Sequence, residues 1–213
     1  FSILLRGCSS LLLYEAGVLA AFRELSPDIL KSASRIYGAS SGSIVATLTL
    51  CECDLGKGYV LPFILFLKRS NVWKFWTFKI LKDLLNKYLP TNAHQLVSGK
   101  LHVIVTRLRD CRSVTISEFA SREDLIQAVM CSCFIPLYCG FLPPTYHGVR
   151  YVDGEIGMWR ANFVDRTTIT VSGFAGEYDI CPKDTPAAFF TFQISDCILY
   201  ISKRNIHRLQ YIL

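Results

Sequence analysis

The sequence predicts an α/β fold in which helices cover a parallel sheet. Near the N-terminus, a short apolar run, a glycine turn and a stretch with helical apolar spacing follow one another over residues 2–25. The same order recurs over residues 35–50. Two strand–turn–helix units in succession are typical of parallel sheets with helices packed on them. The 213 residues are enough for one hydrophobic core, so we expect a single domain over residues 1–213.

Glycines mark where each strand of these units gives way to a helix. An apolar or β-branched run before the glycine is typical of a buried strand, and apolar residues at every third or fourth position after it are typical of a helix. On this basis the strands span 2–5 and 35–37, the turns lie around Gly7 and at 38–42, and the helices span 11–25 and 44–50.

Further elements follow along the chain. Runs rich in β-branched residues at His102–Thr106 and Thr168–Val171 predict two more strands. The stretch Ser121–Asp124 reads as a capping box and predicts a helix over Leu125–Cys131. The proline-rich stretch Pro143–Gly148 predicts a loop.

The composition excludes some classes of protein. Apolar residues make up 51% and charged residues 19%, a balance that excludes a disordered chain and leaves apolar surface for a lipid or a partner. The net charge is +6, but no Lys/Arg run accompanies a nucleic-acid-binding motif, so we expect no nucleic-acid partner. An anionic membrane surface fits the charge at least as well. The longest uncharged apolar run, Tyr59–Leu67, contains Pro62 and is far shorter than the ~20 residues of a membrane-spanning helix.

Nine cysteines are scattered along the chain. Their odd number and the lack of a signal-peptide pattern predict thiols that are mostly buried and reduced, in a cytoplasmic protein. The close pairs Cys51/Cys53 and Cys131/Cys133 lack the two-residue spacer and the matching second half of a zinc site, so we expect no metal there.

The stretch Val72–Leu89 has a strongly apolar helical face and a net basic charge. Such a helix lies either in a membrane interface or, like an ordinary amphipathic helix, with its apolar face on the core, and the segment alone favours the core. The interfacial alternative assigns the lipid contact to Trp73, Trp76, Lys74 and Lys82.

The segment Gly38-Ala39-Ser40-Ser41-Gly42 lies between a predicted strand and a predicted helix, which is the setting of a nucleophile elbow. A sharp turn there lifts the Ser40 hydroxyl above the sheet, and side chains at Gly38 or Gly42 would strike the adjacent backbone. The helix that follows directs its amides toward a developing oxyanion. The pattern makes Ser40 the candidate nucleophile.

A nucleophilic serine needs a proton acceptor, and two candidates are open. His207 would complete a Ser-His-Asp arrangement with Asp165, Asp179 or Asp184. Its surroundings, however, are those of a surface helix. Asp153 ends a β-prone run and precedes Gly154, which places a carboxylate at a strand end, where catalytic groups gather in open α/β sheets. In a Ser-Asp dyad, Asp153 itself accepts the serine proton and must be partly desolvated.

These residues, in this order, resemble the patatin-like phospholipases: a glycine turn near the N-terminus, the Gly38–Gly42 elbow and the Asp153-Gly154 loop. Residues 131–140 and 148–154 resemble the animal subgroup that includes adipose triglyceride lipase and adiponutrin, and residues 99–103 resemble its acylceramide-forming member in skin. The resemblance covers almost the whole chain.

The resemblance implies a three-layer α/β/α fold with a mostly parallel central sheet, a Ser40–Asp153 dyad, and neither metal nor cofactor. It implies a lipase, that is, a serine acyl hydrolase or transacylase for neutral lipid esters such as triacylglycerol. It also implies a cytoplasmic protein that lies peripherally on lipid droplets or membranes. A protein coactivator is a further partner that the resemblance leaves open.

Two departures from the family pattern bear on activity. The oxyanion motif Gly-x-Gly-x-x-Gly corresponds to residues 7–12, so the expected oxyanion donors are the amides of Gly7, Cys8 and Ser9. Ser9 and Leu12 replace glycines, and a side chain at Ser9 is expected to disfavour a positive φ or to crowd the ester. Glu155 follows Gly154 and places a second carboxylate beside the proposed base, which raises the pKa of one of the two.

These departures keep an alternative open, in which the protein retains the patatin fold but is catalytically weak and binds or regulates at a lipid surface. The chain begins at Phe1 rather than Met and stops soon after Arg208-Leu209, so we also expect it to be truncated at both ends.

Overall fold

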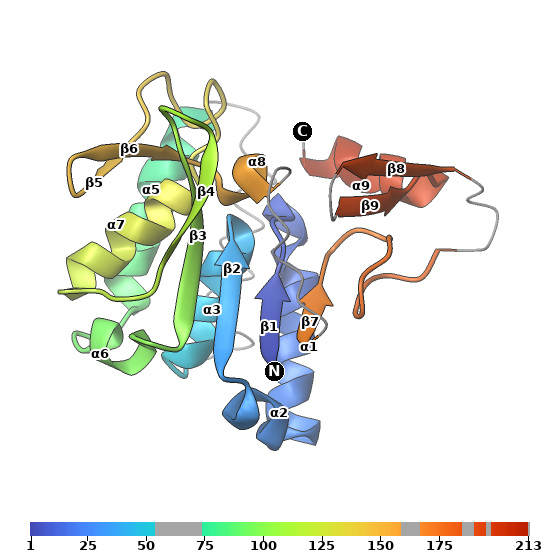
Figure 1. The fold of residues 1–213 in the computed structure, drawn as a ribbon, viewed down its shortest axis with the longest axis horizontal. Coiled ribbons are helices and arrows are strands. Elements are labelled where there is room, and N and C mark those ends of the chain that lie inside the picture. The colour runs from blue at the N-terminus through green and yellow to red at the C-terminus, as the bar shows by residue number, and fades with distance from the viewer. Residues whose placement is uncertain (54–73, 159–166, 185–189, 195–196, 213) are drawn as a thin grey trace.

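The computed structural model describes residues 1–53, 74–158, 167–184, 190–194 and 197–212. The strand order of its central sheet is β5-β6-β3-β2-β1-β7, and β4 also pairs with β3 (Figure 1). Four neighbouring strands run parallel: β1 (Ser2–Leu5), β2 (Arg35–Ala39), β3 (Leu101–Arg107) and β7 (Thr168–Val171). The antiparallel strands are β4 (Arg112–Ile116), β5 (Thr145–Tyr146) and β6 (Val149–Val152). The predicted α/β fold with a mostly parallel central sheet is confirmed.

Side chains of the parallel strands alternate between the two faces of the sheet. One face contributes to a large core cluster through Ile3, Leu5, Ile36, Val103 and Val105. The other face contributes to a small cluster through Leu4, Ala39 and Ile104. Because β1 and β3 are buried on both faces, each contains a continuous apolar run, residues 3–5 and 103–105, rather than an alternating pattern.

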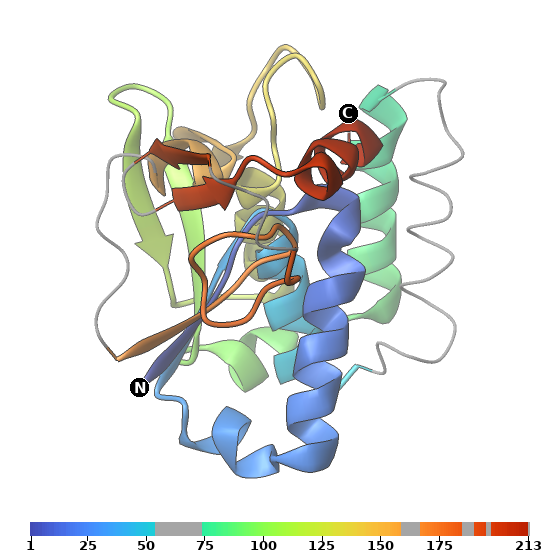
Figure 2. The ribbon, with the colours of Figure 1, turned by 90° about the vertical axis from the view of Figure 1, so that its right-hand side faces the viewer.

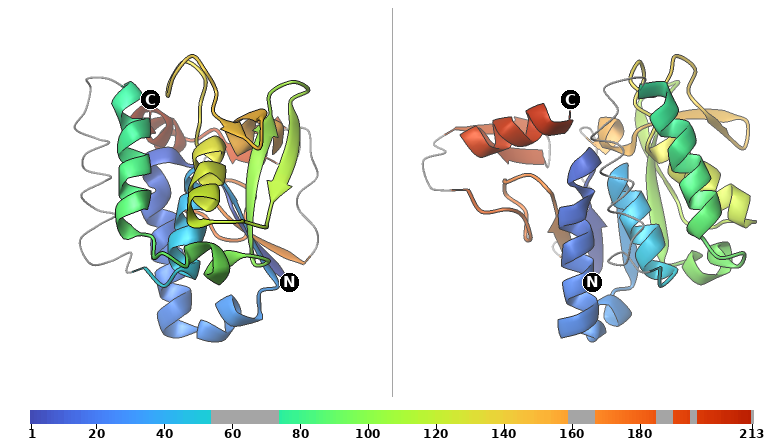
Figure 3. Two further views of the ribbon diagram at one scale, coloured as in Figure 1. Left: turned by 90° about the vertical axis from the view of Figure 1, so that its left-hand side faces the viewer. Right: turned by 180° about the vertical axis from the view of Figure 1, so that it is seen from behind.

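The helices are divided unequally between the two faces. The large core lies under α1 (Leu12–Leu25), α3 (Ser41–Leu50), α5 (Lys74–Tyr88), α6 (Ala93–Val97) and α7 (Arg122–Ser132), which cover one face (Figures 2 and 3). A 3-10 helix, η1 (Ser9–Leu11), precedes α1, and α2 (Pro27–Ser32) follows it. On the opposite face, within the described ranges, the short helix α8 (Gly154–Met158) supplies Met158 to the small cluster.

The described half of α5 packs on the core, as the amphipathic reading of Val72–Leu89 favours. Leu81 and Leu85 are buried, whereas Lys82 is exposed. Trp73 and the side chains of Lys74 and Trp76 lie outside the described residues, so lipid contact by this segment stays a prediction.

Helix α7 begins at Arg122, three residues earlier than predicted, because Ser121 caps it. The Ser121 Oγ accepts a hydrogen bond from the Asp124 amide at 3.1 Å. The Asp124 Oδ2 accepts in turn from the Ala120 amide at 3.0 Å, one residue before the position that a capping box uses. Ser121 therefore caps the helix, but the reciprocal hydrogen bond to Asp124 comes from the Ala120 amide instead of the Ser121 amide.

The prediction that Pro143–Gly148 forms only a loop is wrong. Thr145–Tyr146 forms β5 and pairs with β6. His147 and Gly148 both have positive φ in the intervening turn. Two-residue turns of this kind match the twist of a hairpin.

The C-terminal part contains a hairpin of β8 (Thr191–Ile194) and β9 (Cys197–Tyr200), followed by α9 (Lys203–Ile212). The hairpin was not predicted. The buried Asn205 of α9 donates to the carbonyl oxygens of Ala175 and Tyr200. Helix α9 packs beside η1, so it borders the segment between β1 and α1 (Figure 1).

All nine cysteines are free thiols. Cys8, Cys51 and Cys131 are buried, Cys111 is exposed and the others are half-buried, so burial is less general than predicted. Among the described residues, no helix combines the length and the hydropathy needed to cross a membrane, and no three potential metal ligands lie together.

Candidate active site

The strand registers bring Ser40 and Asp153 to the same level of the sheet. The parallel register of β2 on β3, extended by one residue, places Ser40 opposite Val105. The antiparallel register of β6 on β3, extended in the same way, places Asp153 opposite Val105 as well. Two residues from distant parts of the sequence therefore meet where β2 and β6 end.

Ser40 occupies a sharp turn between β2 and α3. Its backbone has φ 52° and ψ −127°, a conformation that residues with side chains rarely adopt. A Cβ at Gly38 would lie 2.6 Å from the Ser43 Cα, and one at Gly42 would strike the backbone of Leu5. The close approach of α3 to β2 and β1 therefore requires glycine at both positions.

The Ser40 hydroxyl donates a hydrogen bond to the Asp153 Oδ2 at 2.6 Å. Asp153 is 4% exposed, and its Oδ1 accepts from the Glu155 amide at 2.9 Å. Burial, together with the negative charge of Glu155, raises the pKa of Asp153 to about 7, although the hydrogen bonds from Ser40 and the Glu155 amide oppose the rise. A carboxyl that changes protonation near neutral pH is suited to act as a general base.

Three hydroxyl groups hold the backbone around this pair, and none of them was predicted. Ser132, at the end of α7, accepts from the Ser40 amide at 2.9 Å. Ser43 donates to the Ser40 carbonyl oxygen at 2.6 Å, and Thr106 donates to the Asp153 carbonyl oxygen at 2.6 Å. Only Ser43 had a sequence signal, because it lies one residue beyond the elbow motif.

The predicted oxyanion donors lie between β1 and α1, beside Ser40. The Gly7 amide donates to the Glu155 Oε1 at 2.5 Å, and the Cys8 amide donates to the Ser41 Oγ at 2.9 Å. The Ser9 amide has no acceptor within the described part of the chain, and Ser9 borders the same pocket as Ser40. Of the three, Ser9 is therefore the candidate donor.

The residues that replace the family's glycines are accommodated. Ser9 has φ 50°, so its side chain does not prevent a positive φ, contrary to the expectation. Leu12 is buried at the start of α1. Glu155 lies on α8 and forms an ion pair with Arg6 at 2.8 Å, which was not predicted. The one available signal was a charge at Arg6 directly after a buried strand.

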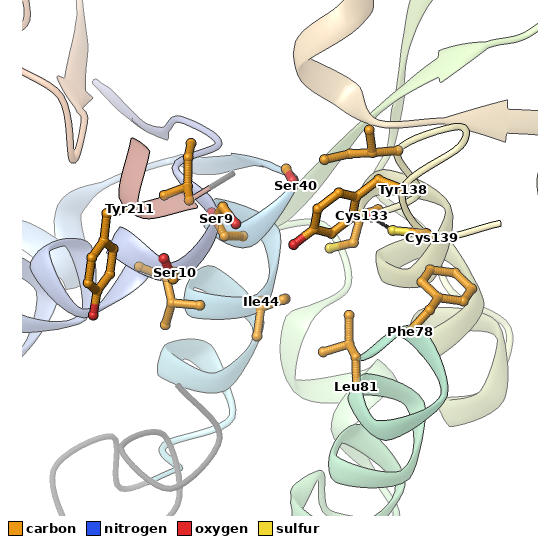
Figure 4. A pocket seen from close by; sticks show the side chains of 14 residues that line it. Ser9, Ser10, Ser40, Ile44, Phe78, Leu81, Cys133, Tyr138, Cys139 and Tyr211 are labelled. Carbon is orange, nitrogen blue, oxygen red and sulfur yellow. Dashed lines mark hydrogen bonds between the residues drawn. The ribbon is translucent and has the colours of Figure 1, made fainter. Parts of the chain in front are cut away.

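A cavity of about 120 Å³ opens beside Ser40 (Figure 4). Ser9 lies on one side of Ser40, and Tyr138 lies on the other. Most of the other residues that line the cavity are apolar, and they include Leu12, Ile44, Phe78, Leu81, Ile135 and Ile212. No charged side chain of the described residues lines it. A reactive hydroxyl at an apolar cavity fits an uncharged ester with a hydrocarbon chain.

The Ser-His-Asp alternative is not supported within the described ranges. His207 is exposed on α9, whereas the Ser40 hydroxyl donates to Asp153. Asp179 accepts from Thr170 and Asp184 pairs with Arg208, while Asp165 lies outside the described residues.

Comparison with known proteins gives consistent matches. The family profile described as patatin-like phospholipase matches residues 3–158. The omega-hydroxyceramide transacylase of Homo sapiens is 39% identical over 220 residues, which cover 100% of this chain and 41% of that protein. Patatin-like phospholipase domain-containing protein 2 of Homo sapiens is 38% identical, with 98% and 43% covered. The 1-acylglycerol-3-phosphate O-acyltransferase PNPLA3 of Homo sapiens is 38% identical, with 98% and 45% covered. The chain thus spans less than half the length of these relatives.

Proposed function

Since this chain belongs to the patatin-like phospholipase family, we propose that it is a serine acyl hydrolase or transacylase that acts on neutral lipid esters. One observation carries the proposal. The Ser40 hydroxyl donates at 2.6 Å to a buried carboxylate, that of Asp153, beside an apolar cavity. This arrangement supplies a nucleophile, a proton acceptor and a place for an acyl chain.

In the proposed reaction, the Ser40 Oγ attacks the ester carbonyl carbon while Asp153 takes the hydroxyl proton. The Ser9 amide and the N-terminal amides of α3 stabilise the oxyanion that forms. The tetrahedral intermediate then expels the alcohol, which receives the proton from Asp153. An acyl-enzyme on Ser40 remains, and water or a hydroxyl of a second lipid, deprotonated by Asp153, takes the acyl group.

Neutral esters of the triacylglycerol type are the proposed substrates. The relatives include proteins named as a ceramide transacylase and as an acyltransferase of an acylglycerol phosphate, which supports acyl transfer between lipids. The described lining of the cavity has no cation that would bind a phosphate group, which favours uncharged esters. We place the activity in the cytoplasm at droplet or membrane surfaces, without metal or cofactor, and with a protein coactivator as a further partner.

The first test compares hydrolysis of a soluble short-chain ester by the wild type, Ser40→Ala and Asp153→Asn. Removal of the nucleophile should lower kcat/KM by at least about 10³-fold, and removal of the base by roughly 10²–10⁴-fold. Ser98→Ala, which changes an exposed serine outside the cavity lining, is the matched control and should stay close to wild type. Equal activity in all four proteins would refute the mechanism.

A second candidate function is lipid-surface binding or regulation with little catalysis. It is favoured by the Gly7 and Cys8 amides, which already have acceptors within the chain. A fluorophosphonate probe separates the two functions, because it reacts only with an activated serine. Labelling of the wild type at Ser40 supports the enzyme, whereas a folded but unlabelled protein supports the binding function.

A further inference from the structure

Two charged side chains meet at the oxyanion loop, defined here as residues 6–9. The Arg6 Nη2 donates to the Glu155 Oε2 at 2.8 Å, and the Gly7 amide donates to the other oxygen, Oε1, at 2.5 Å. The Arg6 side chain is 5% exposed and that of Glu155 is 21% exposed. One carboxylate therefore binds both a guanidinium and a main-chain amide of the loop.

The Gly7 main chain lies between Glu155 and Ser40. A Cβ at Gly7 would lie 2.6 Å from the Glu155 Cγ and 2.9 Å from the Ser40 Cβ. The side chains of Glu155 and Ser40 thus both lie close to the Gly7 main chain.

Arg6 extends these contacts to the C-terminal part of the chain. Its guanidinium carbon lies 5.8 Å from the centroid of the Tyr178 ring, within the range of a cation–π contact. The Tyr178 hydroxyl contacts the Cys197 Sγ of β9 at 3.2 Å. Burial alone lowers the pKa of Arg6, but Glu155 and the other neighbours raise it overall, so the guanidinium is charged.

We propose that Glu155 is a positioning residue that, together with Arg6, clamps the oxyanion loop against Ser40 and engages the Gly7 amide, while the Ser9 amide, which has no acceptor among the described residues, stays available to the substrate. The loop needs an external hold because Ser9 keeps a positive φ that serine disfavours. The effect of this clamp on turnover rests on the proposed function, whereas the clamp itself is a property of the fold.

Hydrogen exchange of the Gly7 amide, followed by NMR in the 213-residue chain, tests the clamp without any reaction. Glu155→Ala removes the acceptor and should speed Gly7 exchange by about tenfold or more, while Glu155→Gln keeps an acceptor oxygen and should change it less. Asp110→Asn is the matched control, because it breaks an ion pair of the same 2.8 Å length, with Arg107, outside the loop. Unchanged Gly7 exchange in Glu155→Ala would overturn the clamp.

Glu155→Ala also leaves the buried Arg6 without its partner, which by itself destabilises a fold. The double variant Arg6→Met/Glu155→Ala removes both charges. The clamp predicts that its Gly7 amide still exchanges fast, although its stability recovers relative to the single variant. A protected Gly7 amide in the double variant would trace the effect to the unpaired charge and would overturn the clamp.

The rate of fluorophosphonate labelling reports the effect on chemistry. Glu155→Ala should label about tenfold more slowly or worse, and Glu155→Gln should stay within about threefold of wild type. In Glu155→Gln, the labelling rate should fall at a lower pH than in wild type when the solution is acidified. The reason is that the Glu155 charge contributes to the raised pKa of Asp153. An unlabelled wild type whose Gly7 exchange responds as expected refutes the proposed function alone. A labelled wild type matched by Glu155→Ala in both rate and exchange refutes the clamp alone.

Discussion

At the scale of single residues, Asp153 carries a conflict between stability and reactivity. Its side chain is 4% exposed, and no cation pairs with it among the described residues. Burial therefore dominates and raises its pKa to about 7, far above the ~3.9 of an exposed aspartate. A carboxylate held in this way is a stronger proton acceptor for Ser40, but it destabilises the folded state whenever it is ionised.

Replacing Asp153 with asparagine should therefore stabilise the fold above neutral pH. The unfolded chain ionises this carboxyl near pH ~3.9 and the folded chain near pH 7, so stability falls as the pH rises through this window. Above it the penalty is roughly 4 kcal/mol. Calorimetry should find the Tm of Asp153→Asn raised at pH 8 and close to wild type at pH 4.

Asp110 is the control for this prediction. A hydrogen bond from Arg107 lowers the pKa of Asp110 to about 2, so its ionised form is favoured in the folded state. Asp110→Asn should therefore not raise the Tm at either pH. The same Tm for Asp153→Asn and wild type at pH 8 would contradict burial as the cause of the raised pKa.

Only part of the site could be predicted from the sequence. Ser40 and Asp153 have local signals, because an elbow needs glycines at fixed spacing and a carboxylate at a strand end is followed by a turn. Ser132 and Thr106 have none, since small hydroxyl residues occur throughout helices and strands and their partners are set by the tertiary fold. Arg6 and Glu155 are 149 residues apart in the sequence, so the residues around one of them give no sign of the other.

At the scale of elements, the short helix η1 fixes how the oxyanion loop meets α1. Ser9 is its first residue and has φ 50°, whereas the next residue, Ser10, is not in a left-handed conformation. A non-glycine residue in that conformation is disfavoured by about 1–2 kcal/mol relative to glycine. Because the backbone strain lies at Ser9 and not at Ser10, substitutions at Ser10 are a matched control for substitutions at Ser9.

Ser9→Gly should therefore be between neutral and about 1 kcal/mol more stable than wild type, since relief of strain outweighs the added freedom of the unfolded chain. Ser10→Gly should lose about 0.5–1 kcal/mol, because glycine gains nothing there. Urea unfolding of both variants measures the difference. A larger loss in Ser9→Gly than in Ser10→Gly would show that the Ser9 side chain stabilises the loop.

Elements were predictable where burial imposes a pattern on the sequence. The parallel strands β1 and β2 are apolar on both faces, and the helices after them keep an apolar stripe toward one core. The β8–β9 hairpin lacks such a pattern, because Thr191, Phe192 and Gln193 are all exposed. Buried and exposed side chains therefore do not alternate along the strand. Strand β5 is too short to give any periodic signal.

At the scale of the whole molecule, the cavity is small for a lipid. Its volume of about 120 Å³ compares with roughly 300–1,000 Å³ for common ligand sites, so most of a lipid ester must lie outside it. The outer loop, residues 135–142, borders the opening through Ile135, Tyr138 and Cys139. Its other large side chains face solvent: Leu137 is 75%, Phe141 79% and Leu142 72% exposed.

Lipid contact is therefore expected at the outer loop rather than along the described half of α5, which packs on the core. The loop before β5 and the turn between β3 and β4 lie at the same end of the sheet (Figure 1). Exposed Arg109 and Arg112 flank that turn and supply positive charge. Apolar side chains beside exposed cations are typical of proteins that bind anionic lipid surfaces.

Replacing Leu137, Phe141 and Leu142 together with serine should weaken binding to lipid vesicles by at least about tenfold, because each loses apolar area that the lipid would otherwise cover. Co-sedimentation in a Ser40→Ala background measures binding without turnover. Hydrolysis of a soluble short-chain ester, measured in the triple variant with Ser40 intact, should stay near wild type while hydrolysis of an emulsified ester falls.

Leu25→Ser is the control, since Leu25 is 81% exposed and ends α1 at the opposite end of the sheet (Figure 1). Undiminished vesicle binding by the triple variant, or an equal loss in Leu25→Ser, would mean that lipid meets the molecule elsewhere, because exposure at the pocket opening is what distinguishes the two sites.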